Sequence, residues 1–250
     1  MELTSSTLPG FDGAPLAMHR MGAGRAVVML HGLFSSAEMN WIKWGHAQLL
    51  AEAGFDVIMP DLRGHGQSAK PHDPAAWPDD VLALDLIALV GGLGLSDYDL
   101  VGFSMGSRTS VRAVLRGLSP QRLVLGGMGL EGLAGWSGRR AHFLDAIDRF
   151  GTIRPGDPSY MTQQFMKSMG IDRVAARLLM DTLTDTPPDL LSGVTMPTLV
   201  VCGDEDRDNG SPERLTAALP HAVHAVIPGT HMGCVTQPHL GRTIRDFLID

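Results

Sequence analysis

The sequence predicts an α/β protein with one doubly wound, mostly parallel β-sheet, flanked by helices and carrying a helical cap insertion. Three observations predict this fold. Short runs rich in Val, Ile and Leu recur along the chain, segments with helical spacing separate them, and one long stretch in the second half lacks any strand pattern. Regular alternation of strand and helix builds right-handed βαβ units, which assemble into such a sheet.

Six apolar runs are predicted to be buried strands. Strands of a parallel sheet are covered on both faces, so they need no alternation with polar residues. The runs are Ala26–Leu30, Phe55–Met59, Tyr98–Val101, Arg122–Leu125, Thr198–Cys202 and Val223–Ile227. The first 24 residues carry glycine turns at 10–13 and 22–24, and we expect them to form a hairpin on the other edge of the sheet.

Five segments between these runs are predicted to be helices, because their apolar residues lie three and four apart. They are Glu38–Ala53, Asp79–Val90, Met105–Gly117, Pro212–Leu219 and Leu240–Leu248. Pro78, followed by Asp79 and Asp80, is expected to open the second of them. Proline fits the first helical turn, and carboxylates are stabilised at the positive end of the helix dipole.

Residues 130–195 interrupt the alternation. Helical patterns occur there at Arg139–Phe150, Ser159–Met169 and Arg173–Thr182, with Gly and Pro between them. Such a segment is too long for a plain connection between two strands. We therefore expect residues 130–195 to form a helical cap, or lid, over a core built from residues 1–129 and 196–250.

Composition excludes several classes of function. The chain has 250 residues, with 20 Lys and Arg against 27 Asp and Glu, a formal charge of −7, and no basic run. Nucleic-acid binding depends on clustered Lys and Arg and is not expected. No apolar stretch approaches the roughly 18 to 20 residues that cross a bilayer, and the first residues do not resemble a signal peptide. Cys202 and Cys234 lack the spacing of a zinc site or a disulfide framework, so we expect a reduced, soluble cytoplasmic protein without a membrane partner.

The strongest local signal is the pattern Gly-x-Ser-x-Gly at residues 102–106. It lies between the apolar run that ends at Val101 and the helical pattern that begins at Met105. A sharp strand-to-helix turn needs residues without a Cβ on either side of the serine. It also places Ser104 at a helix N-terminus, where the N–H of Met105 is a natural donor to an oxyanion.

A serine hydroxyl needs a base, and the base needs an orienting acid. Of the ten histidines, only His231 lies just beyond the last apolar run, between Gly229 and Gly233. His221 and His224 lie beside or within that run and His239 lies in the final helix, where surface or packing roles are expected.

The acid is expected after the run Thr198–Cys202. Residues 203–208 read Gly-Asp-Glu-Asp-Arg-Asp and offer four carboxylates. An acidic loop is usually a solvated face, and it can also bind a divalent cation, but this one lacks the twelve-residue calcium pattern. The residues alone do not choose between Asp204 and Asp206.

Together these residues resemble the α/β-hydrolase superfamily over nearly the whole chain. The resemblance includes His31-Gly32 after the first long strand, the Asp61–Ser68 segment, the serine turn, the acidic loop and the late histidine, in the family order of Ser, acid, His. It implies an α/β-hydrolase fold and selects Asp206, three residues after Gly203, with Asp204 as the fallback. It also implies that the backbone N–H of Leu33 is the second donor of the oxyanion hole.

Other features of the superfamily narrow the interpretation further. Members that carry the acid after an earlier strand make Glu131 the residue to test if Asp206 fails. Haloalkane dehalogenases and epoxide hydrolases use Asp as the nucleophile, whereas residue 104 is Ser. Asp61, Arg63 and His65 are interpreted as structural, because an Asp–Arg pair in this tight turn can bind backbone groups and hold neighbouring loops. His31 is likewise expected to be a packed, hydrogen-bonded residue.

The expected function is that of a serine hydrolase, carboxylesterase-like, acting on small to medium apolar esters with the catalytic triad Ser104, Asp206 and His231. No cofactor and no metal is required. The alternatives are an enol-lactone hydrolase, a carbon–carbon bond hydrolase, a cofactor-free perhydrolase or haloperoxidase, and a ligand receptor without turnover. No pair of arginines is clearly dedicated to a substrate carboxylate, although Arg139, Arg140 and Arg207 lie in segments that could reach the opening.

Overall fold

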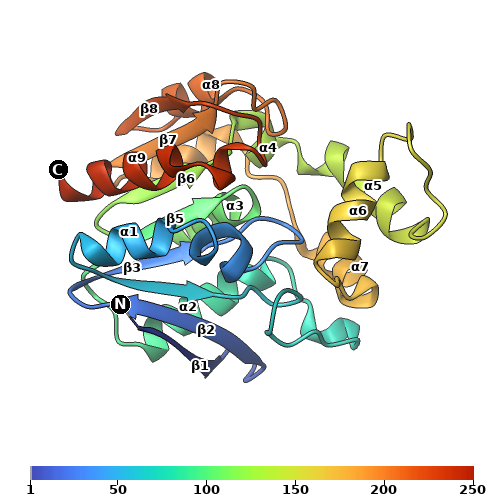
Figure 1. Ribbon diagram of the computed structural model, residues 1–250, viewed down its shortest axis with the longest axis horizontal. Helices are drawn as coiled ribbons and strands as arrows, with labels where there is room; N and C mark the ends of the chain where they lie inside the picture. Colours follow the sequence, from blue (N-terminus) through green and yellow to red (C-terminus); the bar gives the residue numbers. More distant parts are fainter. Residues whose placement is uncertain (1) are drawn as a thin grey trace.

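The computed structural model describes residues 2–250. One sheet of eight strands runs through the molecule in the order β1-β2-β4-β3-β5-β6-β7-β8 (Figure 1). Strands β1 (Leu3–Pro9) and β2 (Pro15–Gly22) form an antiparallel hairpin, β2 pairs antiparallel with β4, and every later pairing is parallel. The predicted doubly wound α/β fold and the edge hairpin are confirmed.

All six predicted strands are present. They are β3 (Arg25–Leu30), β4 (Phe55–Pro60), β5 (Tyr98–Phe103), β6 (Leu123–Gly126), β7 (Thr198–Gly203) and β8 (Ala222–Ile227). The expectation that all are covered on both faces is wrong for β8. It is the last strand of the sheet, and Val223 and Val226 are 56% and 61% exposed.

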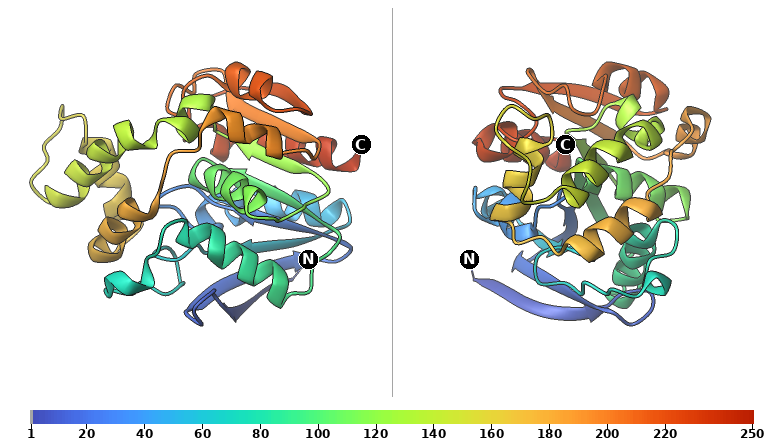
Figure 2. Two further views of the ribbon diagram at one scale, coloured as in Figure 1. Left: turned by 180° about the vertical axis from the view of Figure 1, so that it is seen from behind. Right: turned by 90° about the vertical axis from the view of Figure 1, so that its right-hand side faces the viewer.

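Helices cover both faces of the sheet (Figures 1 and 2). On one face lie α1 (His46–Glu52) and α9 (Pro238–Ile249); on the other lie α2 (Val81–Gly92), α3 (Met105–Leu115) and α8 (Pro212–Ala218). Successive residues of a strand point to opposite faces. Val27 and Met29 of β3 accordingly pack with α1 and α9, whereas Val28 and Leu30 pack with α2 and α3.

The prediction of one continuous helix over Glu38–Ala53 is wrong, because the structure has two separate helical segments there. The chain forms a π-helical turn over Glu38–Ile42, breaks, and begins α1 at His46. The break falls at Gly45, whose φ of 78° lies in the left-handed region that glycine adopts without strain. The remaining short turns are Pro74–Ala76, Pro188–Gly193 and Cys234–Thr236.

The expected role of Asp80 at the start of α2 also needs correction. Its side chain makes no capping hydrogen bond; it is buried and binds Arg112 of α3 and Arg116 at the C-terminal cap of that helix. An arginine pair offers this carboxylate more donors than a helix N-terminus does. Asp80 therefore joins α2 to α3.

Between β6 and β7 the described chain contains helices and no strand. They are α4 (Leu130–Ala134), α5 (Trp136–Asp148), α6 (Tyr160–Ser168) and α7 (Arg173–Thr182). Helices α5, α6 and α7 pack together beyond one end of the sheet, on the right of Figure 1, whereas α4 contacts α8. The division into a core and a cap over residues 130–195 stays a prediction.

The Asp61–Ser68 segment holds loops together, as expected. Asp61 accepts hydrogen bonds from the N–H groups of Ala37 (2.9 Å) and Gln67 (2.7 Å). The expected pairing differs in one respect, because Arg63 binds Asp12 and Asp85 rather than Asp61. Since those carboxylates come from the hairpin turn and α2, Arg63 ties three distant segments together.

Asp99 of β5 is a buried carboxyl whose protonation should affect stability. Its oxygens accept no hydrogen bond among residues 2–250, and Arg25 Nη2, 3.0 Å away, donates to the carbonyl of Leu248. Burial raises the pKa of Asp99 from 3.8 to about 6, although Arg25 opposes the shift. An acid whose pKa is raised by folding contributes stability at low pH and loses it as pH rises through the folded pKa.

We therefore expect Asp99→Asn to be more stable than the natural chain at pH 8, with a free energy of unfolding higher by on the order of 2 kcal/mol, because asparagine carries no charge to bury. The difference should shrink toward zero below pH 4. Urea unfolding at both pH values measures this difference. Asp189→Asn, which removes an exposed carboxylate elsewhere in the chain, is the control. A difference that does not change with pH would contradict the assignment.

The helices of residues 2–250 include none with the length and hydropathy of a membrane span.

Candidate functional site

Ser104 occupies a strained turn between β5 and α3. Its φ and ψ are 54° and −112°, a conformation that few residues other than glycine adopt. The flanking glycines permit it: a Cβ on Gly102 would lie 2.4 Å from the carbonyl carbon of Gly106, and one on Gly106 would lie 2.2 Å from the carbonyl oxygen of Leu30. The turn therefore requires both glycines and projects the hydroxyl from the end of the sheet.

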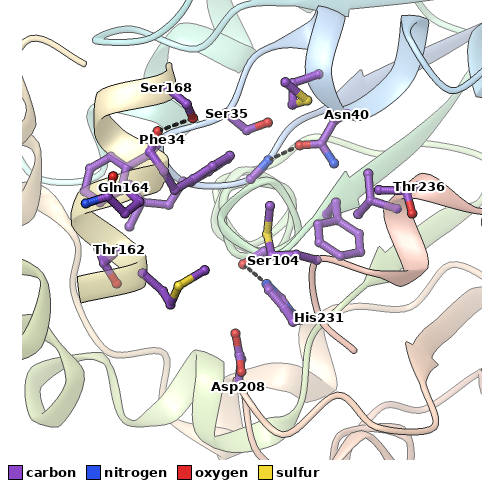
Figure 3. Close-up of a pocket in the computed structure, with 18 of the residues that line it drawn as sticks. Phe34, Ser35, Asn40, Ser104, Thr162, Gln164, Ser168, Asp208, His231 and Thr236 are labelled. Carbon is purple, nitrogen blue, oxygen red and sulfur yellow. Dashed lines mark hydrogen bonds between the residues drawn. The ribbon is translucent and has the colours of Figure 1, made fainter. Parts of the chain in front are cut away.

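The structure brings Ser104, His231 and Asp206 together from three separate loops. With a proton on Nδ1, His231 donates to Asp206 Oδ2 at 2.8 Å. Its Nε2 accepts from the hydroxyl of Ser104 at 3.0 Å (Figure 3). The ring of Phe103 packs against the imidazole with centroids 5.1 Å apart. This arrangement has the connectivity of a nucleophile, a base and an orienting acid.

Asp206 is held as a charged acceptor. Its side chain is buried, and Oδ1 accepts the N–H of Asp208 at 3.0 Å. Burial on its own raises the pKa of this carboxyl, but the hydrogen bonds from His231 and Asp208 outweigh it and hold the pKa below its usual range. Asp206 is therefore suited to stabilise a protonated imidazole.

Asp204 lies in the same loop but serves another purpose. Its Oδ1 accepts the N–H of Gly229 at 2.7 Å, and the N–H of Glu205 donates to the carbonyl of Gly229 at 3.1 Å. A Cβ on Gly203 would lie 2.0 Å from that same carbonyl oxygen. The loop after β7 is thus joined to the loop after β8, which carries His231.

The other candidate acid lies elsewhere in a different network. Glu131 accepts the N–H of Ser211 at 2.8 Å and pairs with Arg214.

Among the histidines, His31 is fully buried and its Nε2 accepts the N–H of Leu62 at 3.0 Å, as expected for a structural residue.

Two backbone N–H groups beside Ser104 are without partners among residues 2–250. In the loop after β3, the N–H groups of Gly32, Phe34 and Ser35 bind Asn40, His65 and Gly32 in turn. The N–H of Leu33 makes no hydrogen bond, and neither does that of Met105 at the start of α3. These are the two donors expected to form an oxyanion hole.

The site opens into a cavity of about 720 Å³. Its walls come from the loop and turn over residues 32–44, the end of β5 with Ser104, helices α5 and α6, and the loops after β7 and β8 (Figure 3). The apolar side chains that line it are Leu33, Phe34, Met39, Trp44, Phe103, Phe143, Met161, Phe165, Met232 and Val235. Other apolar residues of the insertion, such as Met166 and Leu179, are fully buried and form its own core.

Sequence reasoning missed two residues beside the serine. Asn209 donates through Nδ2 to the carbonyl of Gly127 at 2.7 Å and lies 3.5 Å from Ser104 Oγ, while its Oδ1 accepts from Arg139. Arg108, buried in α3, lies on a small cavity next to the serine. The sequence carries no signal for either, since an Asn in a polar loop and an Arg within a helix are common on surfaces.

Comparisons with known proteins concern the family and the fold of the chain. A family model described as "alpha/beta hydrolase fold" matches residues 25–166. The N-formylmaleamate deformylase of Pseudomonas putida is 36% identical over 143 residues, which cover 54% of this chain and 50% of the deformylase. Epoxide hydrolase 2 of Siraitia grosvenorii is 33% identical over 108 residues, which cover 43% of this chain and 33% of that protein.

The chain therefore spans half or less of the length of these two curated relatives. Among solved structures, the esterase EaEST from Exiguobacterium antarcticum superposes with a TM-score of 0.80 at 19% identity, covering 99% of this chain and all of that one. At this identity the likeness concerns the fold alone.

Proposed function

Because the chain belongs to the alpha/beta hydrolase fold family, we propose that it is a serine hydrolase that cleaves small to medium carboxylic esters through an acyl-enzyme intermediate. One observation carries the proposal. The imidazole of His231 is hydrogen-bonded both to the hydroxyl of Ser104 and to the carboxylate of Asp206, and Ser104 and His231 line an apolar cavity. Such a cavity with a few convergent polar groups is the usual form of a small-molecule site.

In the first step, Ser104 Oγ forms a bond to the ester carbonyl carbon while its proton passes to Nε2 of His231. Asp206 keeps the other ring proton on Nδ1 and stabilises the positive imidazolium. The oxyanion accepts hydrogen bonds from the N–H groups of Leu33 and Met105, and a single donor of this kind contributes about 10²- to 10³-fold in turnover. The tetrahedral intermediate then expels the alcohol, which takes the proton from His231.

In the second step, water replaces the alcohol. His231 takes a proton from the water while the water oxygen forms a bond to the acyl carbon. The second tetrahedral intermediate then releases the carboxylic acid, and Ser104 Oγ takes the proton back from His231. The strained turn at Ser104 leaves the hydroxyl exposed to both reactants.

The identity of residue 104 argues against the activity of one group of relatives, the epoxide hydrolases. Epoxide hydrolase 2 is similar over 108 residues, but the reaction expected of an epoxide hydrolase uses an Asp nucleophile, and this chain has Ser104. Enol-lactone hydrolysis, carbon–carbon bond cleavage and peracid formation would use the same three side chains, so these activities belong in the first substrate panel.

Turnover of p-nitrophenyl butyrate tests the proposal. A hydrolase should release many equivalents of p-nitrophenol per chain, whereas a ligand receptor with the same fold should stop after about one equivalent, when Ser104 is acylated. Release that ends near one equivalent would overturn the hydrolase assignment. Lactone and peracid assays under the same conditions then rank the alternatives.

A further inference from the structure

A second, smaller cavity of about 30 Å³ adjoins Ser104. Its lining includes Ser104 and the two residues with unpaired N–H groups, Leu33 and Met105. Its polar side chains otherwise come from Arg108, Trp136, Arg139 and Asn209. The volume exceeds the roughly 10 to 15 Å³ that one water molecule needs, so a small polar group fits.

Arg108 is a buried cation without a carboxylate partner. Its side chain donates through Nη1 to the carbonyls of Gly132 (3.1 Å) and Leu133 (3.0 Å), but Nη2 has no partner among residues 2–250. Burial lowers its pKa to about 10. Buried charges are normally paired, and Arg63, the other fully buried arginine, binds two carboxylates.

Three further side chains of this cavity, those of Trp136, Asn209 and Arg139, also carry donors. The Nε1–H of Trp136 is buried and has no partner within residues 2–250. The carbonyl of Asn209 is occupied by Arg139, so Asn209 offers only its NH₂ group toward Ser104. Arg139 forms no ion pair with a carboxylate in the described chain. A cavity lined by donors and two guanidinium groups favours an anionic acceptor.

We propose that this cavity binds the terminal carboxylate of a short acyl group, so that the preferred substrates are monoesters of short dicarboxylic acids. This inference rests on the proposed function and names its substrate class. The cavity lies on the acyl side, because its wall includes the residues whose N–H groups receive the ester carbonyl oxygen. The larger apolar cavity then receives the alcohol, and Arg108 and Trp136 determine specificity.

Two esters of the same shape test the proposal. Monoethyl succinate carries a carboxylate where ethyl 4-methylvalerate carries an isopropyl group. The natural chain should favour monoethyl succinate by at least about tenfold in kcat/KM, because a site built for a polar group rejects an analogue that leaves its donors unpaired. Equal values, or a preference for the neutral ester, would show that water alone fills the cavity and would overturn the proposal.

Variants assign the preference to this cavity. Arg108→Met should lower the ratio of the two kcat/KM values by at least about tenfold. Trp136→Phe should lower it by about threefold, since phenylalanine keeps an aromatic ring beside Phe143 but has no N–H to donate. Arg154→Met removes an exposed charge remote from the cavity and should leave the ratio unchanged. An equal ratio in the natural chain and in Trp136→Phe would contradict the role of the indole, even if Arg108→Met fails to fold.

Binding separates this proposal from the hydrolase assignment. Calorimetric titration of the Ser104→Ala chain with monoethyl succinate, and with ethyl 4-methylvalerate as the control, needs no turnover. If the Ser104→Ala chain binds the charged ester selectively while the natural chain hydrolyses neither ester, the subsite is supported and the proposed function is refuted. Hydrolysis of both esters without selective binding would do the reverse.

Discussion

Replacement of Ser104 by alanine is expected to lower kcat for p-nitrophenyl butyrate by at least about 10⁴-fold, since loss of the nucleophile in a serine protease costs about 10⁶-fold. No other hydroxyl is hydrogen-bonded to the Nε2 of His231 within residues 2–250. Alanine has the same backbone preferences as serine at this turn, so the fold should persist. Initial rates and thermal unfolding of the purified variant measure both effects.

Ser96→Ala is the matched control, because it removes an exposed hydroxyl outside the site and should leave turnover unchanged. A folded Ser104→Ala chain that retains more than about a tenth of the activity would show that another residue attacks the ester, because a lost nucleophile costs far more than that.

Asp206→Asn is expected to reduce kcat by about 10⁴-fold, the effect of the corresponding substitution in a serine protease. The amide would present an NH₂ group to Nδ1 of His231, which would favour the tautomer whose Nε2 carries the proton and cannot accept one from Ser104. The comparison with Asp204→Asn is informative because both residues lie in one acidic loop.

Asp204→Asn should keep turnover within about threefold of the natural chain, because the side-chain carbonyl of asparagine can still accept the N–H of Gly229. Rates for both variants on one substrate, with circular dichroism to verify folding, measure the contrast. A larger loss in Asp204→Asn would assign the acid to residue 204.

The elements of the sheet were predictable because their signals are local. Each parallel strand is a short apolar run, and the runs coincide with β3 to β8 within a few residues. The serine turn was predictable for the same reason, since Gly102 and Gly106 are required by contacts within a few residues of Ser104 or with the adjacent strand β3. Burial, by contrast, depends on position in the sheet, and β8 lies at an edge that no periodicity reveals.

The choice of acid and the lining of the small cavity depend on contacts between distant segments. Residue patterns left Asp204 and Asp206 equivalent, because the difference arises from how the loop after β7 meets the loop after β8. The sequence likewise does not show which of the two buried arginines, Arg63 or Arg108, has carboxylate partners. As a result of tertiary packing, Arg63 pairs with Asp12 and Asp85, whereas Arg108 donates to two backbone carbonyls and lies over the ring of Trp136.

The close approach of Gly203 to Gly229 has a mechanical consequence. Because the two loops are joined through their backbones, the imidazole and its carboxylate should move as a single body when the molecule fluctuates. The hydroxyl belongs to a different body, the start of α3, and its direct link to the imidazole is one 3.0 Å hydrogen bond between side chains. Thermal motion would therefore break the hydrogen bond between Ser104 and His231 first and interrupt proton transfer there. The carboxylate of Asp206 would remain bound to the imidazole.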